Sequence, residues 1–320
     1  MKKISRVVVA FAALISLSLP VVAQDKVVFR SLSSHGSVSA HELAQELGYF
    51  DKTNVEIKNV GYAGGGPESL FALASGSVDI GGAATPAVIN AVASGNAFLV
   101  AYPENGINKQ TQSLFTVLEG SPIRSIKDIA GKTIAVNTLG AHLDYTVREA
   151  LRSVGLPPDA ANLVVVPGPQ LEQVLRSGQV DIAAFGYWQT TFEGAARSHG
   201  GLRSVFGDTD VLGNIAGGFT VLREDFVQRH PQAAKQFTLQ SAKALDFARE
   251  NPEETKAAIA RILKKRGENP DIAQYFAGYG VRAGGLPDKQ DLQFWIDVLA
   301  REGRVKPESI DAQSLILSLN

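Results

Sequence analysis

The octapeptide LASGSVDI (Leu73–Ile80) returns with two changes as LRSGQVDI (Leu175–Ile182), 102 positions along the chain, and these two copies decide the fold. The first copy is followed by GGAATPA (81–87) and the second by AAFGYWQ (183–189). The Ser-Gly pair in each copy predicts the end of a helix, because glycine tolerates the left-handed backbone that closes helices. The VDI that follows predicts a short buried strand whose aspartate fixes the turn.

Each copy also closes a similar block of sequence. The first block begins with the apolar stretch KVVFRS (26–31) and the second with KTIAV (132–136). In both, strand, polar loop, helix, strand and helix follow one another, which is typical of βαβ units on a mainly parallel sheet. Two such blocks predict two similar α/β lobes.

Two further apolar stretches predict how the lobes are joined. SLFTVL (113–118) can cross from the first lobe to the second, and IAGGFTVL (215–222) can cross back. The sequence thus predicts lobe I from residues 24–113 and 219–320, and an inserted lobe II from residues 114–218. Two crossing strands near 113–118 and 215–222 would form a hinge, and the cleft between the lobes would be a site for a small ligand.

The first 23 residues have the design of a secretory signal peptide. Three basic residues among the first six precede the apolar run Val7–Leu19, which is short for crossing a membrane. Small residues before Gln24 predict cleavage after Ala23 and export to the periplasm.

The composition narrows the class of protein. A chain of 320 residues, 45% of them hydrophobic, can bury the cores of two lobes. The formal net charge of −1 gives no electrostatic reason to bind nucleic acid. The absence of cysteine excludes disulfides, thiolate metal sites and cysteine nucleophiles. We therefore expect a monomer without metal or cofactor.

The enzyme motifs in the sequence are incomplete. HELAQ (41–45) lacks the second histidine that a zinc protease needs, and the glycine run GYAGGG (61–66) is not followed by the lysine of a phosphate-binding loop. No GxSxG motif occurs in the sequence. These observations favour a binding protein over an enzyme.

Several stretches together resemble the periplasmic substrate-binding proteins of ABC importers for sulfonates, taurine and nitrate. They are SSHGSVSAHELAQELGYF (33–50), ESLFALASGSVDIGGAATPAVINAVASG (68–95), GSPIRSIKDIAGKTIAVNTLGAHLDYTVREALRSVGL (120–156) and WQTTF (188–192). The resemblance implies a type II two-lobed fold, in which each lobe is a mainly parallel sheet with helices on both faces. It also implies a membrane permease as partner.

Four loops, the last of them the aromatic segment 185–188, run from the end of a predicted strand into a helix, where free N–H groups and the helix dipole favour an anion. Hydroxyl and backbone N–H donors could then hold an anion without arginine, which these loops lack. Thr85 also suits the role of helix cap before Pro86, and His142 is either a cation or a solvated helix residue. The candidate ligand contacts are Ser34, His35 and Gly36; Ala84 and Thr85; and Asn137, Thr138, Gly140, Ala141 and His142.

Aromatic residues follow the second copy where the first has small ones. Tyr187 and Trp188 predict an aromatic wall for the apolar body of an organic ligand, although aromatics also serve as core. Two weaker candidates are Tyr62 and Asp144. Asp144 complements the helix dipole, or would meet an ammonium group such as that of taurine.

The sequence therefore predicts a binding protein that captures a small organic anion, such as an aliphatic or taurine-like sulfonate, between two lobes for delivery to a permease. Alternatives stay open for the ligand: nitrate, an aromatic sulfonate, a sulfate ester, or a pyrimidine or other heterocycle. An exported enzyme on the same fold is the remaining alternative.

Overall fold

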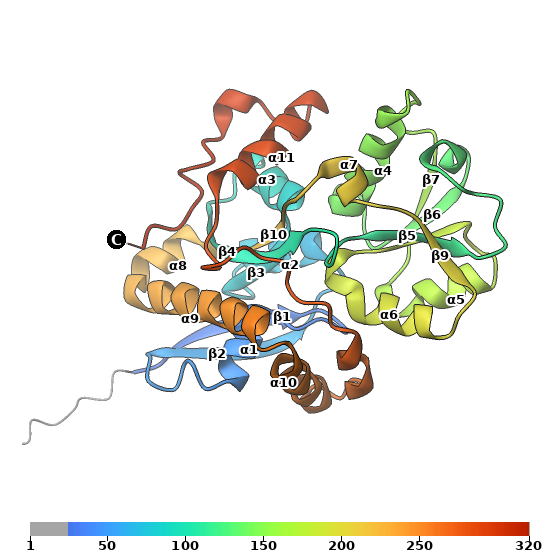
Figure 1. The fold of residues 1–320 in the computed structure, drawn as a ribbon. Coiled ribbons are helices and arrows are strands. Elements are labelled where there is room, and N and C mark those ends of the chain that lie inside the picture. Colours follow the sequence, from blue (N-terminus) through green and yellow to red (C-terminus); the bar gives the residue numbers. More distant parts are fainter. Residues whose placement is uncertain (1–24, 320) are drawn as a thin grey trace, which may run out of the picture.

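The computed structural model describes residues 25–319, so the predicted signal peptide (1–23) lies outside the described residues. The first and last parts of the chain share one lobe, and the middle part forms the other (Figure 1). This arrangement matches the type II two-lobed fold that the resemblance implies. No helix among the described residues is long and apolar enough to cross a membrane.

The strands of lobe I form two adjoining sheets. β1 and β2 pair in parallel, and β10 lies antiparallel between β3 and β4. Because β1 also contacts β3, the strand order is β2-β1-β3-β10-β4. The strands are β1 (Val27–Ser33), β2 (Val55–Tyr62), β3 (Ile80–Ala84), β4 (Phe98–Ile107) and β10 (Ile215–Arg223).

Lobe II repeats this order in a single sheet, β7-β6-β8-β5-β9. The first three strands run parallel, and β5 lies antiparallel between β8 and β9. In each lobe the antiparallel strand is the one that arrives from the other lobe. The strands are β5 (Leu114–Leu118), β6 (Thr133–Val136), β7 (Asn162–Val165), β8 (Ile182–Phe185) and β9 (Leu202–Gly207).

Helices cover both faces of the sheets (Figure 1). Lobe I carries α1 (Ala40–Glu46), α2 (Gly66–Ala74), α3 (Thr85–Ala93), α8 (Glu224–Arg229), α9 (Pro231–Glu250), α10 (Pro252–Lys265) and α11 (Lys289–Arg301). Lobe II carries α4 (His142–Ser153), α5 (Leu171–Arg176) and α6 (Thr190–Ser198), and α7 (Thr209–Leu212) lies between β9 and β10. Short 3₁₀ turns are η1 (Ile126–Ile129), η2 (Gly168–Gln170), η3 (Tyr187–Gln189), η4 (Pro270–Tyr275) and η5 (Pro307–Ser309).

Each face of each sheet has its own apolar core. In lobe I, Phe237 of α9 stacks on Phe29 of β1 at 5.0 Å, and Trp295 of α11 lies in the cluster on the other face. Burying a side chain of this size contributes on the order of 2 kcal/mol. In lobe II, Phe115 and Phe185 belong to separate clusters.

The repeated phrase pins the same pair of strands together in both lobes. Asp79 accepts the backbone N–H of Arg30 in β1 at 3.1 Å, and its own N–H donates to the Arg30 carbonyl at 2.9 Å. Asp181 accepts the N–H of Thr133 in β6 at 2.8 Å, and its N–H donates to the Thr133 carbonyl at 3.0 Å. These aspartates thus join neighbouring strands, whereas the sequence indicated that they fix the turns.

The chain crosses between the lobes through residues 108–113 and 208–214. The stretches expected to cross, 113–118 and 215–222, instead lie almost entirely within the sheets, where β5 pairs with β8 and β9 and β10 pairs with β3 and β4. An apolar stretch finds more buried area inside a sheet than in a connection, so polar segments are left to cross.

Candidate functional site

A cavity of about 100 Å³ lies where the two lobes meet, and we call it the inter-lobe cavity. Its lobe I side is formed by the loops after β1 and β2, by the end of β3 (residues 82–84) and by Glu104 and Asn105 of β4. Its lobe II side is formed by the loop after β6, the η2 turn and the segment 187–192. The cavity thus lies at the carboxyl ends of parallel strands, the usual place for a ligand in open α/β sheets.

The lobes touch on both sides of this cavity. On one side, the Thr191 hydroxyl of lobe II donates to the backbone carbonyl of Gly36 in lobe I at 2.7 Å. On the other side, a Cβ on Gly65 would stand 3.2 Å from Nδ2 of Asn137. These contacts close the lobes around the cavity.

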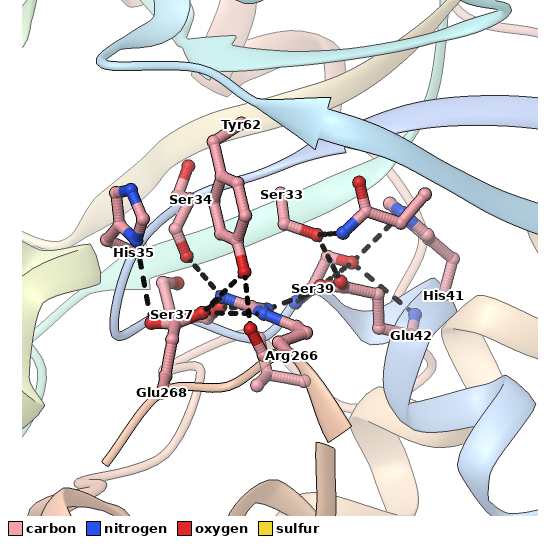
Figure 2. A network of polar contacts seen from close by, with 12 residues as sticks. Ser33, Ser34, His35, Ser37, Ser39, His41, Glu42, Tyr62, Arg266 and Glu268 are labelled. Carbon is pink, nitrogen blue, oxygen red and sulfur yellow. Dashed lines mark hydrogen bonds and ion pairs between the residues drawn. The ribbon is translucent and has the colours of Figure 1, made fainter. Parts of the chain in front are cut away.

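The loop after β1 brings its three predicted residues to the cavity or its edge. Ser34 and His35 line the cavity, and His35 stacks on Tyr62 with ring centroids 4.1 Å apart. Gly36 does not line it, but lies in the seam between the lobes with a φ of +69°. Tyr62 supports His35 from outside the lining (Figure 2).

Arg266, at the end of α10, holds this loop in place and was not among the sequence candidates. Its guanidinium donates to the carbonyls of Ser34 at 2.6 Å and Ser37 at 2.8 Å (Figure 2). It also pairs with the carboxylates of Glu42 and Glu268. Because two carboxylates already match its charge, Arg266 builds the loop and is not a free site for an anion. No local signal links residues so distant in sequence.

β3 runs directly into α3, and of the two candidates at this junction only one lines the cavity. Ala84 lines the cavity, whereas Thr85 is fully buried and its hydroxyl donates to the carbonyls of Ala216 at 3.4 Å and Gly217 at 3.2 Å. Thr85 also does not cap α3, because the helix has Ala84 in the cap position and no side-chain cap bond. The threonine hydroxyl turns toward β10, which sequence periodicity could not reveal.

Only two of the candidates in the loop after β6 and at the start of α4 line the cavity. Asn137 and Ala141 line the cavity, whereas Thr138 is half-buried outside the lining and lies against the Gly65 position. The N–H of Gly140 donates to the Asp144 carboxylate at 2.8 Å. Asp144 also pairs with Arg148, so it serves the start of α4.

His142 is fully buried and lies outside the cavity lining. Its Nε2 lies 2.8 Å from the carboxylate of Asp208, which is equally buried. It is therefore neither a solvated helix residue nor a residue that contacts a ligand in this cavity.

Tyr187 and Trp188 form an aromatic wall of the cavity. Their rings meet edge to face at 4.8 Å, and both line the cavity. Burial, together with the carboxyls of Glu104 and Asp208, raises the pKa of the Tyr187 hydroxyl well above its ordinary value. The hydroxyl therefore stays protonated and can donate a hydrogen bond.

Glu104 of β4 also lines the cavity and was missed in the sequence. Burial first, and the charge of Glu42 second, raise the pKa of Glu104 to about 7. No group within residues 25–319 donates a hydrogen bond to its carboxyl or pairs with it. The signal was a lone acid in the apolar stretch FLVAYPENGI (98–107), because an acid that is partly removed from water without a partner is costly unless it has a function.

Beyond Glu104 the cavity continues into a side chamber of about 40 Å³, which Glu42, Glu104 and His41 line. Burial lowers the pKa of His41 to about 4, so this imidazole is neutral. Glu42 is matched by Arg266, and burial alone would raise the pKa of Glu42, but the Arg266 charge and hydrogen bonds hold it below its ordinary value. Glu104 is thus the unmatched charge of the chamber.

Five backbone N–H groups at or beside the cavity already donate to side chains of the protein. The acceptors are Glu268 for Gly36 (2.6 Å), Glu68 for Gly64 (2.7 Å), Ser69 for Gly82 (3.0 Å), Asp144 for Gly140 (2.8 Å) and Gln189 for Gly186 (2.9 Å). Three of these acceptors are carboxylates of the protein itself, and they take the place that the negative charge of a ligand would have near these N–H groups. The site is therefore richer in acceptors for a ligand than the sequence indicated.

The comparisons with known proteins agree with this fold. The family model described as NMT1/THI5 like matches residues 39–255. A Brucella abortus (strain 2308) protein, provisionally named a binding protein, is 25% identical over 236 residues, which cover 73% of this chain and 70% of the relative.

Solved structures of two-lobed binding proteins superpose on most of the chain. The alkanesulfonate-binding protein SsuA of Xanthomonas axonopodis pv. citri, bound to MOPS, has a TM-score of 0.73 at 18% identity and covers 92% of this chain and 99% of its own. The aliphatic sulphonate-binding protein SsuA of Escherichia coli has a TM-score of 0.70 at 21% identity over 91% and 92%. The nitrate-binding protein NrtA of Synechocystis PCC 6803 has 0.66 at 17% over 91% and 85%. These similarities confirm the fold that the sequence predicted.

Proposed function

Because this chain belongs to the NMT1/THI5-like family, we propose that it is the solute-binding component of an ABC import system, exported to the periplasm after cleavage of residues 1–23. The observation that carries this proposal is the cavity between the two lobes, lined from both sides. The lobes close on a solute, and the closed form delivers it to a membrane permease. The periplasmic sulfonate-binding and nitrate-binding proteins of like fold support the same role.

The ligand that fits this cavity best carries an N–H donor or a cationic nitrogen. Glu104 is the reason, since it offers an acceptor without a partner at the mouth of the side chamber. A simple anion would be repelled by an ionised Glu104 and would find several of the backbone N–H groups engaged, among them those of Gly36 and Gly140. The sequence expectation of an organic anion stays a prediction, and only its zwitterionic form suits the carboxyl.

Two ligand classes meet these demands. An amino-substituted heterocycle would place its donors on Glu104 and its flat ring against Tyr187 and Trp188. A taurine-like zwitterion would place its ammonium on Glu104 and its sulfonate toward Asn137 and Gln189, whose amide nitrogens are donors. The aromatic wall favours the heterocycle.

Calorimetric titration with matched ligand pairs tests this proposal. Taurine is compared with ethanesulfonate, and an aminopyrimidine is compared with the same ring that bears a methyl group in place of the amine. We expect the nitrogen-bearing member of at least one pair to bind at least tenfold more tightly. Glu104→Gln should remove most of that difference, because the amide carries no charge.

Tighter binding of ethanesulfonate or nitrate than of every nitrogen-bearing ligand, unaffected by Glu104→Gln, would contradict the ligand class. Mass spectrometry of the recovered ligand separates a binding protein from an exported enzyme. A binding protein returns the ligand unchanged after prolonged incubation.

A further inference from the structure

A buried polar cluster lies behind the aromatic wall of the inter-lobe cavity, and we call it the hinge cluster: Ser113, His142, Tyr187 and Asp208. His142 and Asp208 are both completely buried, and their side chains are joined at 2.8 Å. The mechanism of ligand contact described above does not use this pair.

The hinge cluster joins the two crossings of the chain. Ser113 ends the first crossing segment (108–113), and Asp208 begins the second (208–214). The backbone N–H of Asp208 donates to the carbonyl of Ser113 at 3.1 Å. The two crossings are therefore bonded to each other at the edge of lobe II.

The same residues support Tyr187 in the aromatic wall of the cavity. The Oγ of Ser113 accepts the backbone N–H of Tyr187 at 3.1 Å, and the His142 ring meets the Tyr187 ring edge to face at 5.0 Å. On its other side the Tyr187 ring lies on β10, since a Cβ on Gly217 would stand 2.5 Å from the Tyr187 Cζ. Tyr187 is thus held between the first crossing and the strand that follows the second.

Stability alone does not account for this cluster. His142 Nδ1, Asp208 Oδ1 and the nearby Trp295 Nε1 are buried without a hydrogen-bond partner within residues 25–319. The His142 and Trp295 rings lie 5.7 Å apart. Unsatisfied buried polar atoms cost stability, and apolar residues of similar volume often replace a buried ion pair without loss.

We propose that the His142–Asp208 pair is a positioning unit, which holds Tyr187 against the ligand and couples its position to the bending of the two crossings. The proposal rests on the proposed function, because it assumes that the cavity takes a ligand. When the lobes open, the packing of Tyr187 on β10 must change, directly beside the Asp208–Ser113 bond that continues the β5–β9 pairing. A ligand that contacts Tyr187 therefore stabilises the closed hinge through His142 and Asp208.

The experiment uses Asp208→Asn and Asp208→Ala, with Ser113→Ala as a second route should Asp208→Ala fail to fold. Spin labels on Lys58→Cys and Lys127→Cys, both exposed and in different lobes, report the distance between lobes in a chain that otherwise lacks cysteine. Near-ultraviolet circular dichroism reports the packing of Tyr187 and Trp188. Denaturant unfolding and calorimetric Kd values are measured on the same variants.

We expect Asp208→Ala to broaden the inter-lobe distance distribution toward the open form and to raise Kd about fivefold or more. Asp208→Asn, which keeps a hydrogen-bond acceptor for His142, should show a smaller change in distance distribution, dichroism and Kd. A purely structural role would lower the unfolding midpoint while leaving the distance distribution and Kd of the folded variants unchanged, and that result would overturn the proposal.

The label measurement on ligand-free protein separates this proposal from the proposed function. If no solute binds to the unmodified chain, the proposed function fails, yet an altered distance distribution in Asp208→Ala still supports the hinge cluster. If the solute binds and neither the distribution nor Kd responds in any folded variant, only the hinge cluster is refuted.

Discussion

Thr191 of lobe II donates its hydroxyl to the backbone carbonyl of Gly36 in lobe I at 2.7 Å, and this bond joins the lobes directly beside the cavity. Gly36 in turn donates its N–H to Glu268 at 2.6 Å, and Arg266 fixes the carbonyls on either side of it. Residues of lobe I thus hold the Gly36 loop in place, and the Thr191 hydroxyl of lobe II bonds to that loop when the lobes are closed.

Thr191→Val should weaken ligand binding, because it removes a bond that exists between the lobes only in their closed arrangement. Losing one neutral hydrogen bond costs about 1 kcal/mol, which corresponds to a rise in Kd of about fivefold in calorimetry. Thr133→Val, within the lobe II sheet, is the matched control and should leave Kd unchanged. An unaltered Kd for Thr191→Val would show that this bond does not support closure.

Gly36→Ala should hinder closure of the lobes, and this effect should exceed the effect of backbone strain alone. Gly36 has a φ of +69°, and an added Cβ would stand 2.4 Å from Cζ of Phe192 in lobe II. Gly131→Ala is the control, because its φ of +71° imposes the same strain of about 1 kcal/mol with no neighbour within 4 Å. Small-angle scattering with ligand present should show a more open form only for Gly36→Ala, and Phe192→Ala should partly reverse that change.

The two aspartates of the repeated phrase should differ in their contribution to stability. Asp79 is buried and also accepts two bonds from the Arg30 guanidinium at 2.8 and 2.9 Å, whereas Asp181 is exposed. Asp79→Ala should therefore lower the free energy of unfolding by about 2–3 kcal/mol and Asp181→Ala by about 1 kcal/mol or less. Urea unfolding of both variants measures the difference, and equal losses would contradict this ranking.

Glu104 should make stability depend on pH between its ordinary and its folded pKa. Its folded pKa of about 7 lies above the ordinary value of 4.5, so the folded protein binds the extra proton in this window. Its contribution to stability therefore falls as pH rises from about 4.5 to 7 and is level above that range. His41, with a pKa lowered by burial to about 4, acts in the opposite direction, so the difference between the unmodified chain and Glu104→Gln isolates Glu104. Unfolding free energies at pH 5, 6, 7 and 8 should show a slope in that difference, and its absence would place the carboxyl in a solvated environment.

Trp188→Ala should weaken organic ligands more than small inorganic anions, because an aromatic wall contributes contact area that nitrate or sulfate cannot use. Titration of one organic ligand and of nitrate with this variant gives the comparison. Equal losses for both would assign Trp188 to the core in place of the ligand wall.

The architecture of this protein could be predicted from its sequence because it depends on patterns of residues that are close together in the chain. The repeated SGxVDI, the alternation of apolar stretches and helices, and the glycine stops depend on residues close in sequence, and they correctly predicted two similar lobes with a cavity between them. The same patterns led to Ser34, Ala84, Asn137 and Tyr187, which lie at or just after the ends of strands and line the cavity.

The chemistry of the cavity was decided only by the tertiary structure. Arg266 and Glu268 contact the loop after β1 although they are more than 200 residues away in sequence. His142, which the sequence predicted as a ligand contact, is instead buried behind the aromatic wall, where it pairs with Asp208. An N–H group at the start of a helix is free for an anion only if no side chain of the folded protein accepts its hydrogen bond. Local sequence patterns do not show whether such a side chain is present. For the same reason the role of Glu104, a single acid in an apolar strand, depends on the fold, which places its carboxyl at the cavity without a hydrogen-bond donor from residues 25–319.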